Sequence, residues 1–242
     1  MTGFHTTAMC STTRAALLTG RNHHSVGMGC LANFDSGFPG YRGKIAADAP
    51  TIAERLRPHG YRNYMIGKWH ATSTTETGPT GPFDGWPLGR GFDRFYGFLE
   101  GETDQFHPEL VCDNHPIEPP GGPDDGYHVS EDMIDQLMKM ISDSKGVRPD
   151  RPFFAYVPFG ATHAPHQAPE RYLQKYRGKY DEGWDVVGAA ADARAEDVSD
   201  FSVRAPTILV MGNEGSGLRT NVRRACNRLI EIPRSASSAA GV

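Results

Sequence analysis

The spacing of hydrophobic and polar residues predicts three helices in the first 150 residues. From Ser130 onward a hydrophobic face recurs every three or four residues, which is the period of a helix that packs on a core; its members are Met133, Ile134, Leu137, Met138 and Ile141. Good helix formers follow Ser11 and stop at Gly20, a residue type that commonly ends helices. Thr51, with Glu54 three residues later, matches a capping box and predicts the start of another helix.

Short apolar runs between these helices predict strands over 61–66 and 151–157, the second of them buried. Because helices and strands alternate, we expect an α/β fold with a mainly parallel sheet. Ligands of such sheets usually bind at the loops that follow the carboxyl ends of the strands. The residues that follow these two strands are therefore the first places to look for a site.

The composition changes near Gly188, where a small, polar, alanine-rich stretch predicts a linker over 188–205. Beyond it, short apolar runs flank a glycine-rich turn and a basic helix, which together predict one β-α-β unit. Its parts are a strand over 207–211, a turn over 212–217, a helix over 218–227 and a strand over 228–232. No repeat at the periods of solenoid proteins is present.

Composition narrows the possible classes of protein. The 242 residues include 25 Lys and Arg against 29 Asp and Glu, and the net charge of −4 argues against a globally basic nucleic-acid binder. Four scattered cysteines indicate neither a disulfide framework nor a thiolate zinc site. No apolar run approaches the roughly 20 residues of a membrane helix, and the nine residues before Cys10 lack the pattern of an export signal. We therefore expect a cytoplasmic product that does not bind membranes.

Cys10 is the first residue with candidate chemistry, because it lies at the predicted start of a helix. The backbone N–H groups and the positive dipole end there favour an anion and lower the pKa of a thiol. Arg14 lies four residues later, on the same helix face, and could hold a tetrahedral anion at Cys10 by forked hydrogen bonds. A buried cysteine beside a surface arginine is the simpler alternative, and spacing alone favours it.

Two further candidate groups follow the predicted strands. Lys68 and His70 come directly after the first strand, where a cation and an acid–base group could converge, although a solvated lysine and a packed histidine explain the pattern equally well. His163 and His166 follow the second strand. Their spacing allows a zinc site, but the proline between them breaks the helix that such a pair normally requires, which argues against zinc.

Taken together and in this order, these motifs resemble the arylsulfatase family of sulfuric-ester hydrolases. The resemblance covers roughly residues 1–187. The segments that carry it are Cys-Ser-Thr-Thr-Arg-Ala-Ala-Leu-Leu-Thr-Gly-Arg (10–21), Gly-Lys-Trp-His (67–70), Gly-Arg-Gly-Phe-Asp-Arg-Phe-Tyr-Gly-Phe (89–98), Ala-Thr-His-Ala-Pro-His (161–166) and the run that ends at Asp185. It implies the alkaline-phosphatase-like α/β fold and a small-molecule sulfate ester as substrate.

The resemblance also implies a role for each matching residue. Cys10 would be oxidised to formylglycine by a formylglycine-generating enzyme and would then supply the nucleophile. Arg14 would orient its hydrate, and Lys68 would neutralise the sulfate oxygens. His70 would hydrogen-bond the hydrate, and His163 would assist the leaving group, with His166 as the second choice for that role.

The chain departs from the family pattern at several positions. The family has Pro or Ala two residues after the cysteine, where this chain has Thr12. The family also binds a calcium-like cation through an Asp-Asp pair before the cysteine and a later Asp-Asn pair. The pairs at 124–125 and 113–114 stand in the wrong order and context, so no metal ligand is assigned. We expect a sulfatase domain that is truncated at its N-terminus and has impaired activity; since the family includes exported members, the compartment stays open.

The tail resembles a different family, the SpoU-type RNA ribose 2′-O-methyltransferases with a trefoil knot, over 206–233. Ile-Leu-Val-Met-Gly-Asn-Glu-Gly-Ser-Gly-Leu-Arg and the later Cys-Asn-Arg-Leu-Ile-Glu-Ile-Pro carry this likeness. It implies an S-adenosylmethionine pocket lined by Gly212, Glu214, Gly215 and Ile232, with RNA as the partner, followed by a short tail over 234–242. The first hypothesis is thus a sulfuric-ester hydrolase; the alternatives are a methyltransferase fragment or a non-catalytic, truncated or fused reading frame.

Overall fold

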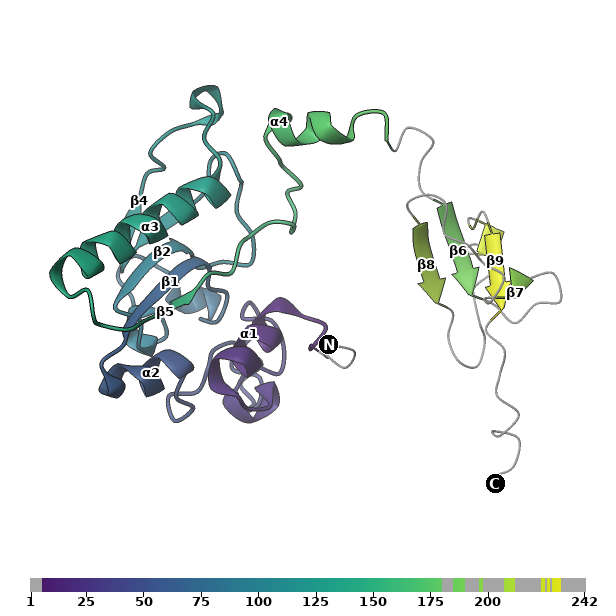
Figure 1. Cartoon of the computed structure of the whole chain (residues 1–242). Helices are drawn as coiled ribbons and strands as arrows, with labels where there is room; N and C mark the ends of the chain where they lie inside the picture. The colour runs from purple at the N-terminus through teal and green to yellow at the C-terminus, as the bar shows by residue number, and fades with distance from the viewer. Residues whose placement is uncertain are drawn as a thin grey trace. The chain divides into compact units, whose positions relative to one another are not determined.

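The computed structural model describes residues 6–179 without a break, and then 185–189, 196–197, 207–211, 223–224, 226 and 228–231. The chain forms two compact units, Met1–Pro169 and Glu170–Val242. Figure 1 shows the first unit as a sheet with helices on both faces and the second as a smaller group of strands. Five of the seven strand pairings in the described residues are parallel, which confirms the expected α/β fold with a mainly parallel sheet.

The first unit has a mixed sheet in the order β4-β3-β2-β1-β5. The two central pairings, β1 with β2 and β1 with β5, are parallel, while β2–β3 and β3–β4 are antiparallel. The strands are β1 (Arg62–Lys68), β2 (Arg94–Phe98), β3 (Leu110–Cys112), β4 (His115–Ile117) and β5 (Phe153–Tyr156). The prediction that β5 is buried is wrong: it is the edge strand within the described residues, and Phe153 is 41% exposed.

The helices are short except for α3, and several single turns connect the strands. The α-helices are α1 (Cys10–Thr19), α2 (Ile52–Leu56), α3 (Val129–Val147) and, in the second unit, α4 (Glu170–Leu173). The 3-10 helices are η1 (His23–Val26), η2 (Arg57–His59), η3 (Thr74–Glu76), η4 (Leu88–Arg90), η5 (Pro123–Asp125) and η6 (Gln174–Tyr176). No helix in the described residues is both long and apolar enough to cross a membrane.

Two hydrophobic cores cover the two faces of the first sheet. Strand residues point alternately to opposite faces, so Tyr64 and Ile66 pack against α3, together with Met133 of that helix. Met65, between them, faces the other way and joins the core formed with α1 and α2, which includes Leu18 and Ala53. Figure 1 shows α3 along one face and α1 and α2 along the other. The sheet is thereby fixed as the middle layer of three.

The predicted end of α1 and the predicted start of α2 are confirmed. Gly20 follows α1 in the left-handed conformation at φ 66°, and its N–H donates to the carbonyl of Ala16. Thr51 and Glu54 form the capping box before α2. The start of α1 differs from expectation, because its N-cap is Met9, which makes no side-chain cap.

The second unit contains a four-stranded parallel sheet in the order β7-β9-β6-β8. Its strands are β6 (Asp185–Ala189), β7 (Glu196–Asp197), β8 (Thr207–Met211) and β9 (Arg228–Glu231). The two strands predicted for the tail are confirmed as β8 and β9, but β6 lies between them.

The predicted linker over 188–205 differs from the structure at both of its described portions. Gly188 and Ala189 end strand β6, and Glu196 with Asp197 forms β7. The backbone of β6 is hydrogen-bonded to neighbours on both sides, and this pairing outweighs the weak strand preference of Gly and Ala. The proposed S-adenosylmethionine residues Gly212, Glu214, Gly215 and Ile232 lie outside the described residues.

Candidate active site

The candidate residues of the first unit gather at one edge of its sheet. Lys68 is the last residue of β1, and the segments with Glu102 and His163 follow the parallel strands β2 and β5. Parallel strands end at the same edge, so these side chains are brought together although they are far apart in the sequence. Gly67 lets the end of β1 lie close to the segment that follows β5, since a Cβ at this position would lie 2.2 Å from the carbonyl oxygen of Pro158.

Cys10 at the start of α1 faces His70. Its Sγ lies 3.1 Å from Nδ1 of His70. The backbone of His70 has a positive φ of 48°, an uncommon conformation that is stabilised by a hydrogen bond from its N–H to the carbonyl of Leu99. The imidazole of His70 therefore contacts Cys10, the residue that the sequence indicates as the nucleophile precursor.

Arg14 follows one helical turn after Cys10 and reaches the end of β1. Its Nη1 donates to the carbonyl of Lys68 at 2.6 Å and lies 3.5 Å from the hydroxyl of Tyr156. Its Nε is buried and has no hydrogen-bond partner among the described residues. A half-buried guanidinium with an unused donor is suited to binding an oxyanion. Arg14 is therefore not the simple surface charge of the alternative interpretation.

Lys68 is an almost completely buried cation, 2% exposed. Burial lowers its pKa below the ordinary value, and repulsion from Arg14 adds to this, while Cys10 and Glu102 act in the opposite direction. A buried ammonium next to a guanidinium needs negative charge nearby. This pair therefore favours a bound anion beside Cys10.

His70 is neutral at neutral pH. Burial, together with repulsion of the imidazolium by Lys68, Arg14 and His163, lowers its pKa to about 4. Its other ring nitrogen, Nε2, lies 2.8 Å from Oδ1 of Asn33. A neutral imidazole in this place can accept a proton or a hydrogen bond at one nitrogen while it donates at the other.

His163 lies at the open side of the site, with 46% of its side chain exposed. Its Nδ1 is 2.9 Å from the carbonyl of Ala164 and 3.3 Å from Oε2 of Glu102. Both neighbours are acceptors, so the proton of a neutral ring sits on Nδ1 and Nε2 is left free. His166 is also exposed, and no hydrogen bond or ion pair within residues 6–179 joins it to the other candidates.

The site thus combines a helix N-terminus, a buried lysine, a half-buried arginine and two imidazoles around one cysteine. A cavity of about 450 Å³ opens next to it and is lined by Cys10, Arg14 and Tyr156, among others. These groups could bind a tetrahedral oxyanion, transfer a proton at Cys10 and assist a leaving group.

Comparison with known proteins assigns the chain to a family. A model of the Sulfatase family matches residues 1–221. This chain belongs to the sulfatase family. The match extends past the predicted boundary at residue 187 and into the segment that resembles SpoU-type methyltransferases; that resemblance and the domain boundaries stay predictions.

Individual sulfatases support the assignment. An uncharacterized sulfatase of Schizosaccharomyces pombe is 34% identical over 206 residues, which are 77% of this chain and 35% of that protein. The arylsulfatase of Klebsiella aerogenes is 30% identical over 201 residues, 77% of this chain and 40% of that enzyme. Human arylsulfatase A is 27% identical over 261 aligned positions, 97% of this chain and 48% of that enzyme. The chain thus spans less than half the length of each of these relatives.

A solved structure confirms the expected fold. The crystal structure of Ps i-CgsB in complex with k-i-k-neocarrahexaose superposes with a TM-score of 0.55 at 23% identity, over 69% of this chain and 38% of that one. The core of the first unit is therefore the α/β core of sulfatases.

Two of the carboxylates considered for a metal in this sulfatase are engaged elsewhere. Asp113 is paired with Arg94 at 3.0 Å, and Asp125 accepts a hydrogen bond from the N–H of Gly122 in the loop of η5. Among the described residues no group of three or more His, Cys, Asp or Glu side chains is placed to hold a metal ion. The described residues do not fit the calcium site expected for the family, and we derive no step through a metal.

Three residues of the site were missed by sequence reasoning: Asn33, Glu102 and Tyr156. Asn33 and Glu102 lie in loops without periodic pattern, so neither spacing nor hydropathy marks them. Tyr156 ends β5, and its position at the carboxyl end of a predicted strand was the available signal.

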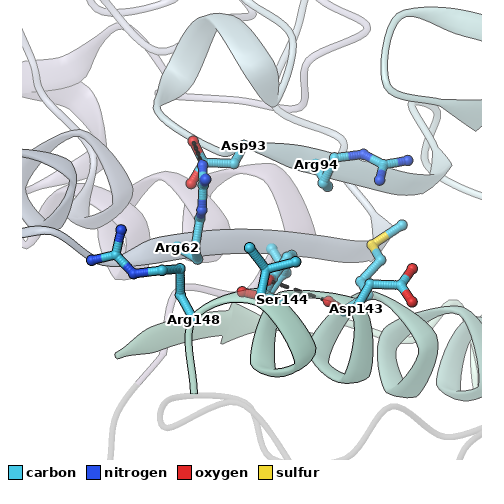
Figure 2. Close-up of a pocket in the computed structure, with 9 residues that line it drawn as sticks. Arg62, Asp93, Arg94, Asp143, Ser144 and Arg148 are labelled. Carbon is cyan, nitrogen blue, oxygen red and sulfur yellow. Dashed lines mark hydrogen bonds and ion pairs between the residues drawn. The ribbon is translucent and has the colours of Figure 1, made fainter. Parts of the chain in front are cut away.

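Another pocket, of about 380 Å³, lies at the opposite end of the strands (Figure 2). It is formed by the first residues of β1 and β2 and the last turns of α3. Figure 2 shows Arg62 beside Asp93, whereas Arg94 and Arg148 point away from each other. Arg94 is paired with Asp113 outside the pocket. These arginines do not converge on one point, so the pocket lacks the arrangement that distinguishes the Cys10 site.

Proposed function

We propose that this protein hydrolyses sulfuric esters by means of a formylglycine derived from Cys10, with small sulfate esters, aryl sulfates first among them, as substrates. The observation that carries the proposal is the convergence of Arg14, Lys68 and His70 on Cys10 in a member of the sulfatase family. Formylglycine, when hydrated, supplies one hydroxyl that attacks sulfur and a second whose deprotonation expels sulfate.

The cations bind and orient the sulfate group. Lys68 and Arg14 lie on the side of Cys10 that faces the end of β1 and neutralise the oxygens of the ester. Their attraction for the ester grows as charge develops on the oxygens, so they stabilise the transition state more than the bound substrate.

The two imidazoles move the protons. Nδ1 of His70 lies next to the Cys10 side chain and accepts the proton of a hydroxyl at that position. The free Nε2 of His163 donates a proton to the departing alcohol or phenol when the ring is charged. Glu102, next to Nδ1 of His163, holds the ring in that orientation.

Conversion of Cys10 requires a formylglycine-generating enzyme that accepts Thr12. The side chain of Thr12 is buried, and its hydroxyl donates to the carbonyl of Met9. This hydroxyl is therefore part of the folded start of α1. We infer that Thr12 slows the conversion.

A sulfate-release assay tests the proposed function. The chain, produced together with a formylglycine-generating enzyme, is expected to release sulfate from a nitrophenyl sulfate, and Cys10→Ala is expected to abolish the release. Cys30→Ala removes a thiol that is 20 positions away in the sequence and serves as the matched control. Turnover that is unaffected by Cys10→Ala would refute the proposed chemistry.

One observation keeps the methyltransferase alternative open for the tail. The strands β8 and β9 form where the apolar runs of the tail predict them, with helical residues Arg223 and Arg224 between them in the sequence. Equilibrium binding of S-adenosylmethionine to the full chain tests this alternative, and absence of binding removes it.

A further inference from the structure

The imidazole of His70 is held between two side chains. Its Nδ1 lies 3.1 Å from Sγ of Cys10, and its Nε2 lies 2.8 Å from Oδ1 of Asn33. A neutral imidazole carries a single N–H, and a carboxamide oxygen can only accept a hydrogen bond. The proton of the neutral ring therefore belongs on Nε2, where it is donated to Asn33.

We infer that Asn33 is a positioning residue that selects the tautomer of His70 and thereby makes Nδ1 the proton acceptor at Cys10. The catalytic meaning of this inference rests on the proposed function, because a proton has to leave the side chain at position 10. The tautomer itself is a property of the unmodified chain. It can be measured whether or not the chain is active.

The structure holds Asn33 in place through the same helix turn that carries Cys10. Ser11, completely buried in α1, accepts a hydrogen bond at its Oγ from the N–H of Ala32 at 3.0 Å. This bond fixes the loop immediately before Asn33. These contacts connect the helix, the loop and His70. Cys10 and Ser11 are adjacent in the helix, and Ala32 and Asn33 are adjacent in the loop. His70 contacts both Cys10 and Asn33.

Gly101 restricts the ring from its face. A Cβ at this position would lie 2.8 Å from Cε1 of His70 and 3.1 Å from Nε2. The backbone of Gly101 therefore lies directly against the imidazole and limits its tilt. Because this face of the imidazole is covered, the contacts at its two nitrogens decide which of them carries the proton.

Asn33 is a neutral hydrogen-bond partner of His70, whereas other groups around the ring are charged. Lys68, Arg14 and His163 all disfavour a charged ring, and Glu102 faces Lys68 and His163. A neutral acceptor at Nε2 fixes the proton without favouring the imidazolium. A carboxylate at the same position would fix the same tautomer and would also favour the charged ring. The side chain of Asn33 is exposed, so its replacement opens no cavity.

Nitrogen NMR of the histidine side chains in the full, unconverted chain tests the inference, with His70 assigned by comparison with His70→Gln. We expect a pyrrole-like Nε2 and a pyridine-like Nδ1 in the wild-type chain. Asn33→Ala is expected to give a mixture of tautomers. Asn33→Asp is expected to keep the tautomer and to raise the titration midpoint of His70 by about one pH unit or more. Ser36→Ala, in the same loop, is expected to leave the signals of His70 unchanged.

A proton on Nδ1 in the wild-type chain overturns the inference without any variant. A single Nε2–H tautomer that persists in Asn33→Ala overturns it too, as does an Asn33→Asp titration that is not raised. These outcomes are separate from those of the sulfate-release assay: failure of that assay with an intact Nε2–H tautomer removes the proposed function alone. When Cys10 has been converted to formylglycine, Asn33→Ala is expected to lower kcat about tenfold while KM is unchanged.

Discussion

Lowering the pH from 7 to 5 is expected to destabilise the first unit through one buried imidazole, that of His70. Burial, with repulsion from Lys68 and Arg14, lowers the pKa of His70 from 6.5 to about 4 on folding. Between these two values the unfolded chain binds a proton that the folded chain does not bind. The free energy of unfolding therefore falls as the pH falls through this window.

The size of the effect follows from the two pKa values. With an ordinary value in the unfolded chain and a value of about 4 in the fold, the loss is about 2 kcal/mol between pH 7 and pH 5. That is a substantial part of the 5–15 kcal/mol by which domains are usually stable. Asp35 and Asp104, whose pKa values are lowered by hydrogen bonds, weaken the fold only in more acidic solution, since the ordinary pKa of an aspartate is 3.8.

Urea unfolding of the wild-type chain and of His70→Gln at both pH values measures the effect. Tryptophan fluorescence in a Trp184→Phe background reports on the first unit, because the two remaining tryptophans, Trp69 and Trp86, are completely buried there. The His70→Gln chain lacks the titrating ring and is expected to lose about 2 kcal/mol less than the wild type over this range. His59→Gln, which removes an exposed imidazole, is the control and is expected to behave as the wild type does.

Equal losses in the wild type and in His70→Gln between pH 7 and pH 5 would refute the reasoning. Such a result would mean that the fold does not hold this ring neutral. The assignment of Nδ1 as a proton acceptor at neutral pH would then lose its basis.

Three further substitutions test separate parts of the account. Arg14→Lys keeps the charge but cannot reproduce the forked geometry of the guanidinium, and kcat of converted chain is expected to fall about 100-fold in the sulfate-release assay; an unchanged kcat would show that Arg14 is only a structural cation. Glu102→Gln removes the carboxylate next to His163. It is expected to slow the hydrolysis of esters with poor leaving groups about tenfold more than that of nitrophenyl sulfate. Equal effects on both substrates would contradict the positioning of His163 by Glu102. Thr51→Ala breaks the capping box before α2 and is expected to cost about 1 kcal/mol in urea unfolding, while Thr74→Ala, on an exposed turn, is expected to cost much less.

Local patterns were sufficient to predict the parts of the site that depend on local geometry. Helical spacing placed Cys10 and Arg14 on one face of α1, and the ends of two predicted strands marked Lys68 and His163. The structure brings these residues together because β1 and β5 run parallel and end at the same edge. The order of the motifs then pointed to the sulfatase family, which the family model confirms.

Long-range contacts were not predictable in this way. Asn33 meets His70 across 37 positions of sequence, and its own loop has no periodicity that would mark it. The neutral state of His70 depends on burial and on cations from other segments, which no local pattern records. The strand β6 was assigned in part to a linker because Gly and Ala carry little strand preference, whereas its pairing with two neighbours decides its structure.

Peptide mass spectrometry of the segment around Cys10 tests the central claim most directly. The chain is produced with and without a formylglycine-generating enzyme, and the peptide that contains Cys10 is analysed after proteolysis. The account predicts that, with the enzyme present, part of the peptide has exchanged its thiol for a carbonyl oxygen, and that sulfate release rises with the converted fraction. A peptide that retains only the thiol, in cells that convert a control sulfatase, would contradict it.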